Sequence, residues 1–342
     1  MYKYARKAFF QLDAETAHNI AIDAIGAAER SGLMRLFAQK VPDDPVELMG
    51  LTLPNPVGLA AGLDKNGEAY NGFGAMGFGF VEVGTVTPRP QPGNPKPRLF
   101  RLVESGGIIN RMGFNNKGVH YMVDRLKHRR YGGVLGVNVG KNFDTPVENA
   151  ADDYCYCMKA VYPYADYITA NVSSPNTKGL RDLQFGKSLD DLLVAIKEQQ
   201  DKLSQQYDRY VPLAVKIAPD VDREGIKQIA ESFVQHNIDG VIATNTTIDK
   251  TAVANQPHGN EEGGLSGEPL QERSTEVVAQ LASELKGALP IIGVGGIHDG
   301  KSAAEKIRAG ATAIQFYSGF IYEGPELIRE AADAIASVRR GA

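Results

Sequence analysis

The sequence predicts an α/β protein, a closed (β/α)8 barrel of the TIM type with an N-terminal helical extension. Three observations lead to this fold class. Eight short apolar runs follow one another from residue 56 onward, amphipathic stretches lie between most of them, and 342 residues with 43% hydrophobic content suffice for one large core. A doubly wound sheet is the rival. It is disfavoured because eight strands in unbroken alternation suit closure better and no G-x-G-x-x-G follows the first strand.

The eight runs carry small or β-branched residues on both faces, as parallel strands buried on both sides do. Helices are expected at 188–203 with Ser188 as the N-cap, at 222–237, and at 299–311, which ends in an Ala-Gly C-cap signal. The runs span residues 56–62, 80–86, 133–140, 166–173, 211–218, 239–246, 289–296 and 312–319.

Residues 1–40 stand apart from the barrel, to which we assign residues 41–342. They predict one or two amphipathic helices, with Asp13 as an N-cap. Six Lys or Arg and four Asp or Glu give this segment a charge of +2, whereas the rest of the chain carries −6. The pattern leaves two interpretations open: a helical cap that plugs the open end of the barrel, or a hydrophobic, slightly basic patch that lies on a membrane surface. The Pro-rich residues 41–56 predict a linker with a short two-stranded ribbon.

Composition limits the function classes. The net charge of −4 and the pI near 5.9 argue against a general nucleic-acid binder. No stretch approaches the ~20 apolar residues of a membrane span, and no apolar signal-peptide region follows the basic N-terminus. Cys155 and Cys157 have no second ligand pair with metal spacing, so we expect no metal site and two reduced core cysteines of a cytosolic protein.

The residues that follow each strand carry the chemistry, because the carboxyl ends of barrel strands meet on one face. Each residue alone is consistent with a turn, a helix cap or a solvated side chain. Together they are almost all amides, hydroxyls, Lys or Gly, with Asp64 the single acid, which suits a large neutral or anionic ligand rich in carbonyl acceptors. The set is Ala61, Gly62, Asp64, Lys65, Asn66, Gly84, Thr85, Thr87, Asn138, Gly140, Lys141, Asn171, Ser173, Ser174, Asn176, Lys216, Thr244, Asn245, Thr246, Gly295, Gly296, Tyr317, Ser318 and Gly319.

Two parts of this set can be separated. Gly295-Gly296 and residues 317–319 follow the last two strands, where barrels hold a phosphate with backbone N–H groups and a helix N-terminus. Lys65 and Lys216 are expected to project inward, where an ammonium near the N1–C2 side of a flavin would stabilise the charge that builds up on reduction. A Schiff-base lysine of an aldolase-type barrel is the alternative. It is disfavoured because that chemistry would call for proton-shuttling acids nearby.

Ten sequence blocks, in order, resemble the dihydroorotate dehydrogenase family over about residues 4–330. They are GLAAGLDKNGE, GTVTPRPQPGNPKPRLFRL, INRMGFNN, NVGKN, NVSSPNT, VKIAPD, ATNTT, GGLSG, GVGGI and QFYSGF. The resemblance implies an FMN-binding barrel that oxidises (S)-dihydroorotate to orotate in de novo pyrimidine (UMP) biosynthesis. Ser174, where the soluble class is expected to carry Cys, and the helical residues 1–40 imply the quinone-dependent class 2. The alternative is a soluble relative that uses fumarate or NAD.

The resemblance also implies residue roles. Amide side chains can both donate to and accept from the cyclic imide of orotate, and Lys65 can meet its carboxylate. Arg111 could do so too, although it could instead form a structural ion pair. FMN is expected at Ala61, Gly62, Leu63, Asp64, Lys65, Thr85, Asn138, Asn171, Lys216, Thr244, Gly267, Gly296, Tyr317 and Ser318. Dihydroorotate is expected at Lys65, Asn110, Arg111, Met112, Gly113, Phe114, Asn171, Asn176, Asn245 and Thr246.

The resemblance makes Ser174 the catalytic residue, which would take a proton from C5 while hydride passes from C6 to flavin N5. A serine hydroxyl needs a relay or a dry, polarising site to act as a base, and residues 177–188 are expected to form a lid. A membrane quinone is expected between the N-terminal helices, with His18 and Arg101 as polar contacts, although His18 could be an ordinary helix-surface histidine. The missing presequence suggests a peripheral protein on the cytoplasmic face of a bacterial cell membrane, with the lipid bilayer surface as a partner.

Overall fold

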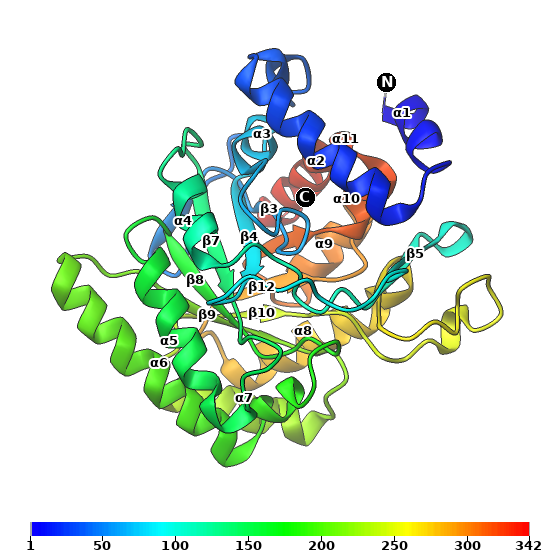
Figure 1. The fold of residues 1–342 in the computed structure, drawn as a ribbon. Coiled ribbons are helices and arrows are strands. Elements are labelled where there is room, and N and C mark those ends of the chain that lie inside the picture. Colours follow the sequence, from blue (N-terminus) through cyan, green and yellow to red (C-terminus); the bar gives the residue numbers. More distant parts are fainter. Residues whose placement is uncertain (1, 342) are drawn as a thin grey trace.

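The structure, a computed structural model, describes residues 2–341, the side chain of Arg35 excepted. Eight parallel strands close into a barrel, and helices surround it (Figure 1). Hydrogen-bonded neighbours follow the order of the chain around the ring, and each strand lies inside one of the eight apolar runs, so the predicted barrel is confirmed. The strands are β3 (Val57–Leu59), β4 (Phe80–Val86), β7 (Val134–Val139), β8 (Tyr167–Asn171), β9 (Leu213–Ile217), β10 (Gly240–Ala243), β12 (Ile291–Val294) and β13 (Ala313–Phe316).

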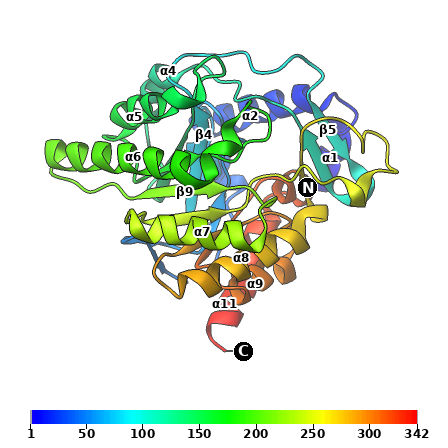
Figure 2. The same ribbon diagram turned by 90° about the horizontal axis from the view of Figure 1, so that it is seen from below.

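Most of the helices pack around the outside of the barrel (Figure 2). Two predicted helices are α7 and α9, whose N-caps Asp222 and Asp299 accept hydrogen bonds from backbone N–H groups. The predicted N-cap Ser188 is wrong: α6 begins at Gly186, directly after the 3-10 helix Leu180–Gln184, so Ser188 lies inside its first turn. The helices after β3 are α3 (Tyr70–Ala75), α4 (Val119–Leu126), α5 (Ala150–Val161), α6 (Gly186–Tyr207), α7 (Arg223–Gln235), α8 (Gln271–Leu285), α9 (Gly300–Arg308), α10 (Ser318–Glu323) and α11 (Glu326–Arg339).

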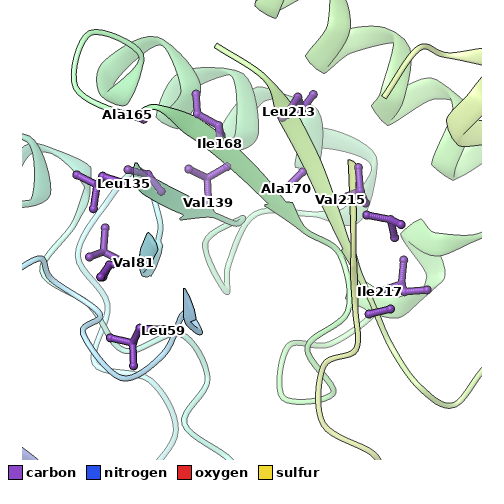
Figure 3. Packing of buried hydrophobic residues seen from close by; sticks show 14 of the residues in the cluster. Leu59, Val81, Leu135, Val139, Ala165, Ile168, Ala170, Leu213, Val215 and Ile217 are labelled. Carbon is purple, nitrogen blue, oxygen red and sulfur yellow. The ribbon is translucent and has the colours of Figure 1, made fainter. Parts of the chain in front are cut away.

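Alternation along the strands divides the core into two layers. Outward residues such as Val81, Ile168 and Val215 pack under the helices (Figure 3). The interior is filled by large side chains next to glycines. A Cβ at Gly58 would lie 2.4 Å from the ring of Phe80, and one at Gly136 would lie 2.1 Å from the ring of Tyr167. Glycine at these two positions therefore leaves room for the aromatic rings that fill the barrel.

The predicted ribbon closes the amino end of the barrel. It consists of β1 (Val46–Leu48) and β2 (Leu51–Leu53), which pair antiparallel. Buried Val46, Leu48 and Leu53 belong to the same apolar cluster as Phe80 and Tyr167. This hairpin, and not the N-terminal helices, therefore plugs that end of the barrel.

A second sheet was not predicted. Its strands β5 (Leu99–Leu102), β6 (Gly107–Asn110) and β11 (Gly264–Gly267) pair antiparallel in the order β11-β6-β5. Each has only four residues, and β11 joins from a segment about 150 residues further along the chain, so local periodicity gives little sign of it. The segments that form it follow β4 and β10, which places this sheet beside the carboxyl end of the barrel.

The N-terminal residues form the predicted helices α1 (Tyr2–Phe9) and α2 (Ala14–Arg30), followed by the 3-10 helix Leu33–Leu36. The expected N-cap is confirmed, because Asp13 Oδ1 accepts a hydrogen bond from Thr16 N at 2.9 Å. α1 packs against α10, and α2 packs against α3 and β5. Within residues 2–341, no helix combines the length and apolar character needed to cross a bilayer.

A buried ion pair holds α2 against the rest of the molecule. Glu15 Oε1 lies 2.7 Å from Arg98 Nη2, and both side chains are less than a tenth exposed. Burial acts to raise the pKa of Glu15, but the hydrogen bonds and charges of Arg98 and Lys96 together outweigh it and hold the pKa below its ordinary value. A depressed carboxyl pKa means that the pair stabilises the fold above the unfolded-state pKa and that this contribution is lost as pH falls through the folded-state pKa.

We expect Glu15→Ala to loosen α2, because it leaves the Arg98 guanidinium buried without its counter-charge, at a cost of about 3 kcal/mol. Hydrogen exchange at residues 14–30 should become faster than in the wild type at neutral pH. Asp23→Ala, which removes an exposed carboxylate of the same helix, is the matched control and should leave exchange unchanged. Equal exchange rates in the two variants would contradict this role for the ion pair.

Candidate active site

A cavity opens at the carboxyl end of the barrel, with about 1030 Å³ of empty space that is partly open to solvent. Residues in or after seven of the eight barrel strands line its wall, and β7 contributes none of the lining residues. The lining contains two lysines, Lys65 and Lys216, and no carboxylate. A space with this composition suits an anionic ligand or one that gains negative charge during reaction.

The floor of the cavity is a buried hydrogen-bond network. Thr85 Oγ1 donates to Asn138 Oδ1 at 2.5 Å, and Asn171 Nδ2 donates to both of these side chains. Below them, the carboxylate of Glu82 accepts hydrogen bonds from Asn138 Nδ2 and from the hydroxyl of Tyr167, each at 2.8 Å. These contacts fix the positions of Thr85 and Asn171, which line the cavity.

Lys216 extends from β9 toward the cavity and is 95% buried. Burial lowers the pKa of its ammonium group, while the negative charge of Glu82 acts in the opposite direction. Glu82 therefore helps to keep a positive charge at the base of the cavity even though water is largely excluded.

Glycines form the end of the cavity near β11, β12 and β13. Gly267 and Gly296 have φ values of 91° and 74°, and a Cβ at Gly296 would lie 2.1 Å from Gln271 Cα. Ser318 Oγ lies 2.9 Å from Ser266 Oγ beside them. Backbone amide groups can approach a ligand closely here, as they do where proteins bind phosphate.

Amide and hydroxyl groups form the other end of the cavity. Asn176 Nδ2 donates to the backbone oxygen of Asn110 at 3.1 Å, and Asn245 Nδ2 donates to Ser173 Oγ at 3.0 Å. Thr246 Oγ1 is buried at the cavity wall without a hydrogen-bond partner among the described residues. An unpaired buried hydroxyl in a cavity is a position where a polar ligand would supply the missing partner.

Ser174 lies in the same region and is 94% buried. Its Oγ accepts a hydrogen bond from Asn176 N at 3.2 Å. The segment after it is held in place by Arg181, which donates to Ser173 O at 3.1 Å, to Asp220 Oδ2 at 2.7 Å and to Thr246 O at 2.8 Å. One guanidinium thus ties the loops after β8, β9 and β10 together.

Lys65 follows β3 and donates to Gly62 O at 2.8 Å. Burial lowers its pKa to about 8, with smaller and opposing contributions from Glu15 and Arg98. Burial, together with the charge of Lys65, lowers the pKa of His18 on α2 to about 3, so this imidazole is neutral at physiological pH. The first helices of the chain therefore bring a neutral histidine close to the cationic wall of the cavity.

A family model described as dihydroorotate dehydrogenase matches residues 45–338. The chain belongs to the dihydroorotate dehydrogenase family. A curated relative from Cellvibrio japonicus, dihydroorotate dehydrogenase (quinone), is 60% identical over 341 residues that cover 100% of both chains. The protein of the same name from Saccharophagus degradans is 59% identical over 337 residues, which cover 98% of this chain and 99% of that one.

Solved structures agree with this membership. The DHODH of Eimeria tenella in complex with ferulenol superimposes with a TM-score of 0.86 at 40% identity, covering 94% of this chain and 92% of that chain. The resemblance carried by the ten sequence blocks is confirmed, and the curated relatives bear the name of the quinone-dependent class. The dihydroorotate dehydrogenase family is flavin-dependent.

The cavity brings together most of the residues that the dihydroorotate dehydrogenase resemblance implies. The expected FMN residues that line it are Ala61, Gly62, Lys65, Thr85, Asn171, Lys216, Thr244, Gly267, Gly296, Tyr317 and Ser318. The expected substrate residues that line it are Lys65, Asn110, Met112, Gly113, Phe114, Asn171, Asn176, Asn245 and Thr246, and Ser174 lies among them.

Several implied residues lie outside the lining. Asn138 is under the floor. Asp64 accepts hydrogen bonds from Glu68 N and Ala69 N, each at 2.8 Å, so it and Leu63 shape the loop that carries Lys65. Arg111 Nη1 lies 2.8 Å from Glu261 Oε2. Arg111 therefore forms the structural ion pair that was the alternative to a contact with the substrate carboxylate.

Of the two residues expected at a quinone, His18 belongs to α2, and Arg101 of β5 contacts the segment between α1 and α2. Arg101 donates to the backbone oxygens of Phe9, Phe10 and Leu12, and its guanidinium lies 4.6 Å from the centre of the Phe10 ring. Arg101 thus fixes the connection between α1 and α2, and His18 lies on the following helix.

Sequence reasoning missed several residues that line the cavity and two that hold its walls in place. Leu270, Val294, Ile297 and Phe316 add apolar wall, and their types give no sign of a ligand. Ser266 lies in the quoted GGLSG block and could have been found from it. Glu82 and Arg181 act through partners far away in the chain, which no local pattern indicates.

Proposed function

We propose that this protein oxidises dihydroorotate to orotate in pyrimidine biosynthesis, using bound FMN and passing the electrons to a membrane quinone. The observation that carries the proposal is the cavity itself, where Ser174 lies among Asn110, Asn176 and Asn245 next to Lys65. Relatives that match the whole chain at about 60% identity bear the name of this quinone-dependent activity. A fumarate- or NAD-linked enzyme is the alternative, and those names do not favour it.

The residues present fit FMN. Gly62, Gly267 and Gly296 have positive φ values, so side chains there would strain the backbone, and glycine lets the backbone approach a ligand closely. No described residue accepts a hydrogen bond from the Gly296 N–H group. Gly296 and Ser318 would hold the phosphate with backbone N–H groups, while Lys216, Thr85 and Asn171 would contact the ring. When bound, the flavin would supply the hydride acceptor and the electron link to the quinone.

Dihydroorotate would occupy the end of the cavity lined by amides. Asn110, Asn176 and Asn245 offer both donors and acceptors to a cyclic imide, and Thr246 offers its unpaired hydroxyl. The Lys65 ammonium would pair with the carboxylate. The Arg111 guanidinium pairs with Glu261, so we assign the charge contact to Lys65 alone.

Ser174 would act as the base that removes the proton from C5 of the substrate. The hydrogen bond from Asn176 N to its Oγ stabilises negative charge on that oxygen, and burial keeps competing water away. The segment 177–188 would act as a lid over this site, with Arg181 as the contact that holds it closed.

The quinone would approach through residues 1–40, which we propose as the membrane-facing segment of the protein on a barrel formed by residues 41–342. Phe10 and Ala14 of this segment pack with Tyr317 and Tyr322, so an apolar region leads from α1 and α2 to the cavity wall. Leu33, Leu36 and Phe37 are exposed near the end of α2, and they would insert into the lipid surface. Such an attachment is peripheral, at the cytoplasmic face of a bacterial membrane.

The electron acceptor distinguishes this proposal from its alternative. We expect the purified protein to be yellow, to release FMN on denaturation, and to oxidise dihydroorotate with a soluble quinone analogue but not with fumarate or NAD. Steady-state rates with the three acceptors, measured by orotate absorbance, test this. A colourless protein that binds no added FMN would contradict the proposal, and a rate higher with fumarate than with quinone would favour the soluble class.

Ser174→Ala should keep FMN bound and lower turnover by at least the ~10² typical of a lost general base. Ser174→Cys should retain more turnover, since a thiol with an ordinary pKa of about 8.5 ionises more readily than a serine hydroxyl. Rapid mixing of the oxidised protein with dihydroorotate, followed by flavin bleaching, measures the affected step. Near-normal bleaching in Ser174→Ala would remove Ser174 from the role of base.

The pKa of Lys65 predicts a pH dependence for binding of the product. An amine with a pKa of about 8 is charged below that pH and neutral above it, so orotate affinity should fall as pH rises from about 7 to about 9. Lys65→Met should bind orotate more weakly at pH 7 and lose this dependence, whereas the exposed Lys227→Met should behave as wild type. Titration of flavin absorbance with orotate measures both effects, and an unchanged slope in Lys65→Met would refute the assignment.

A further inference from the structure

Lys306 is a buried lysine outside the cavity lining, and the proposed mechanism does not use it. It lies on α9 with no exposed surface, and its stem runs beside β12, within 3.5 Å of where a Cβ on Gly293 would be. Its Nζ donates to Gln271 O at 3.1 Å, to Ser274 Oγ at 2.5 Å and to Thr275 Oγ1. All three acceptors belong to the first turns of α8, so one ammonium group holds α8 and α9 together.

Ser274 links this ammonium group to the glycines of the cavity. Its Oγ donates to Gly295 O at 2.8 Å. Because Gly295 O points toward Ser274, and the C=O and N–H bonds of a trans peptide point in opposite directions, the N–H group of Gly296 is turned away from α8. Both glycines line the cavity, and no described residue accepts a hydrogen bond from Gly296 N.

The ammonium group decides which of two carbonyl oxygens receives the hydroxyl hydrogen of Ser274. A serine hydroxyl has a single hydrogen, and Ser274 Oγ could also donate to Gln271 O at 3.1 Å. Gln271 O already accepts hydrogen bonds from Lys306 Nζ and from Thr275 Oγ1, the latter at 2.7 Å. Since an ammonium group only donates, Ser274 Oγ must accept from it, and its own hydrogen is left for Gly295 O.

We propose that Lys306 is a positioning residue for the phosphate of the cofactor, acting through Ser274 to set the orientation of the Gly295–Gly296 peptide. The inference rests on the proposed function, because it requires a ligand with a phosphate at these glycines. Lys306 does not touch that phosphate. It fixes the backbone donor that does, and it thereby favours flavins that carry a phosphate over those that lack one.

The test compares FMN with riboflavin, which has the same ring and no phosphate. Apoprotein of the full chain is titrated with each flavin at pH 6.5, where an amine whose pKa burial lowers to about 7 still carries its proton in most molecules. We expect Lys306→Met and Ser274→Ala each to lower the ratio of FMN affinity to riboflavin affinity by about 10-fold or more. The double variant should change the ratio about as much as either single change, because both act through one contact.

Thr275→Val is the matched control. It removes one acceptor of the ammonium group and one donor to Gln271 O. Lys306 still donates to Gln271 O and to Ser274 Oγ, so the contact between Ser274 and Gly295 should persist and the affinity ratio should stay within about 3-fold of wild type. Ser274→Ala carries the test by itself if Lys306→Met does not fold.

The outcomes separate this inference from the proposed function. A wild type that binds neither flavin overturns both. The wild type could prefer FMN while the variants keep that preference or lose affinity for both flavins equally. Either result overturns only the role of Lys306 and Ser274.

Discussion

Closing eight strands into a barrel leaves an interior that side chains must fill, and this constraint shapes both ends of the molecule. Toward the amino end the filling is aromatic, with Phe80 and Tyr167 beneath the β1–β2 hairpin. Toward the carboxyl end it is polar and centres on Glu82, a fully buried carboxylate. Such a group is tolerated only when donors surround it, and here Asn138, Tyr167, Thr169 and Gln315 all donate to it. Because Asn138 also contacts Thr85 and Asn171, the network that satisfies Glu82 also builds the floor of the cavity.

The N-terminal helices share an electrostatic neighbourhood with that site. Glu15 is paired with Arg98, and both charges act on the pKa of Lys65 in the cavity wall. Lys65 in turn acts on the pKa of His18. A helix that leaves its place would therefore change the charge state of the substrate end as well as the access route along α1 and α2. The position of these helices therefore affects the charge state of Lys65 and His18 through electrostatic interactions, in addition to packing.

The sequence predicted what depends on local pattern. Eight two-sided apolar runs gave the barrel strands, and the polar residues directly after them gave most of the cavity wall. It failed where distant segments meet. The sheet of β5, β6 and β11, the Arg111–Glu261 pair and the Arg181 contacts each join positions far apart in the chain, which no periodicity encodes. Glu82 was missed because a carboxylate inside an apolar run gives no sign of which strands will surround it.

The charge distribution of the cavity bears on how a serine can serve as a base. Two ammonium groups and no carboxylate line the space around Ser174, and Asn176 N donates to its Oγ. Loss of a proton from Ser174 would place negative charge in an environment already arranged to receive it, so the site itself lowers the cost of forming a serine alkoxide. The same positive environment would stabilise the charge that develops on a flavin during reduction and would hold the carboxylate of the substrate. One electrostatic feature of the barrel rim can therefore serve proton removal, hydride transfer and substrate binding together.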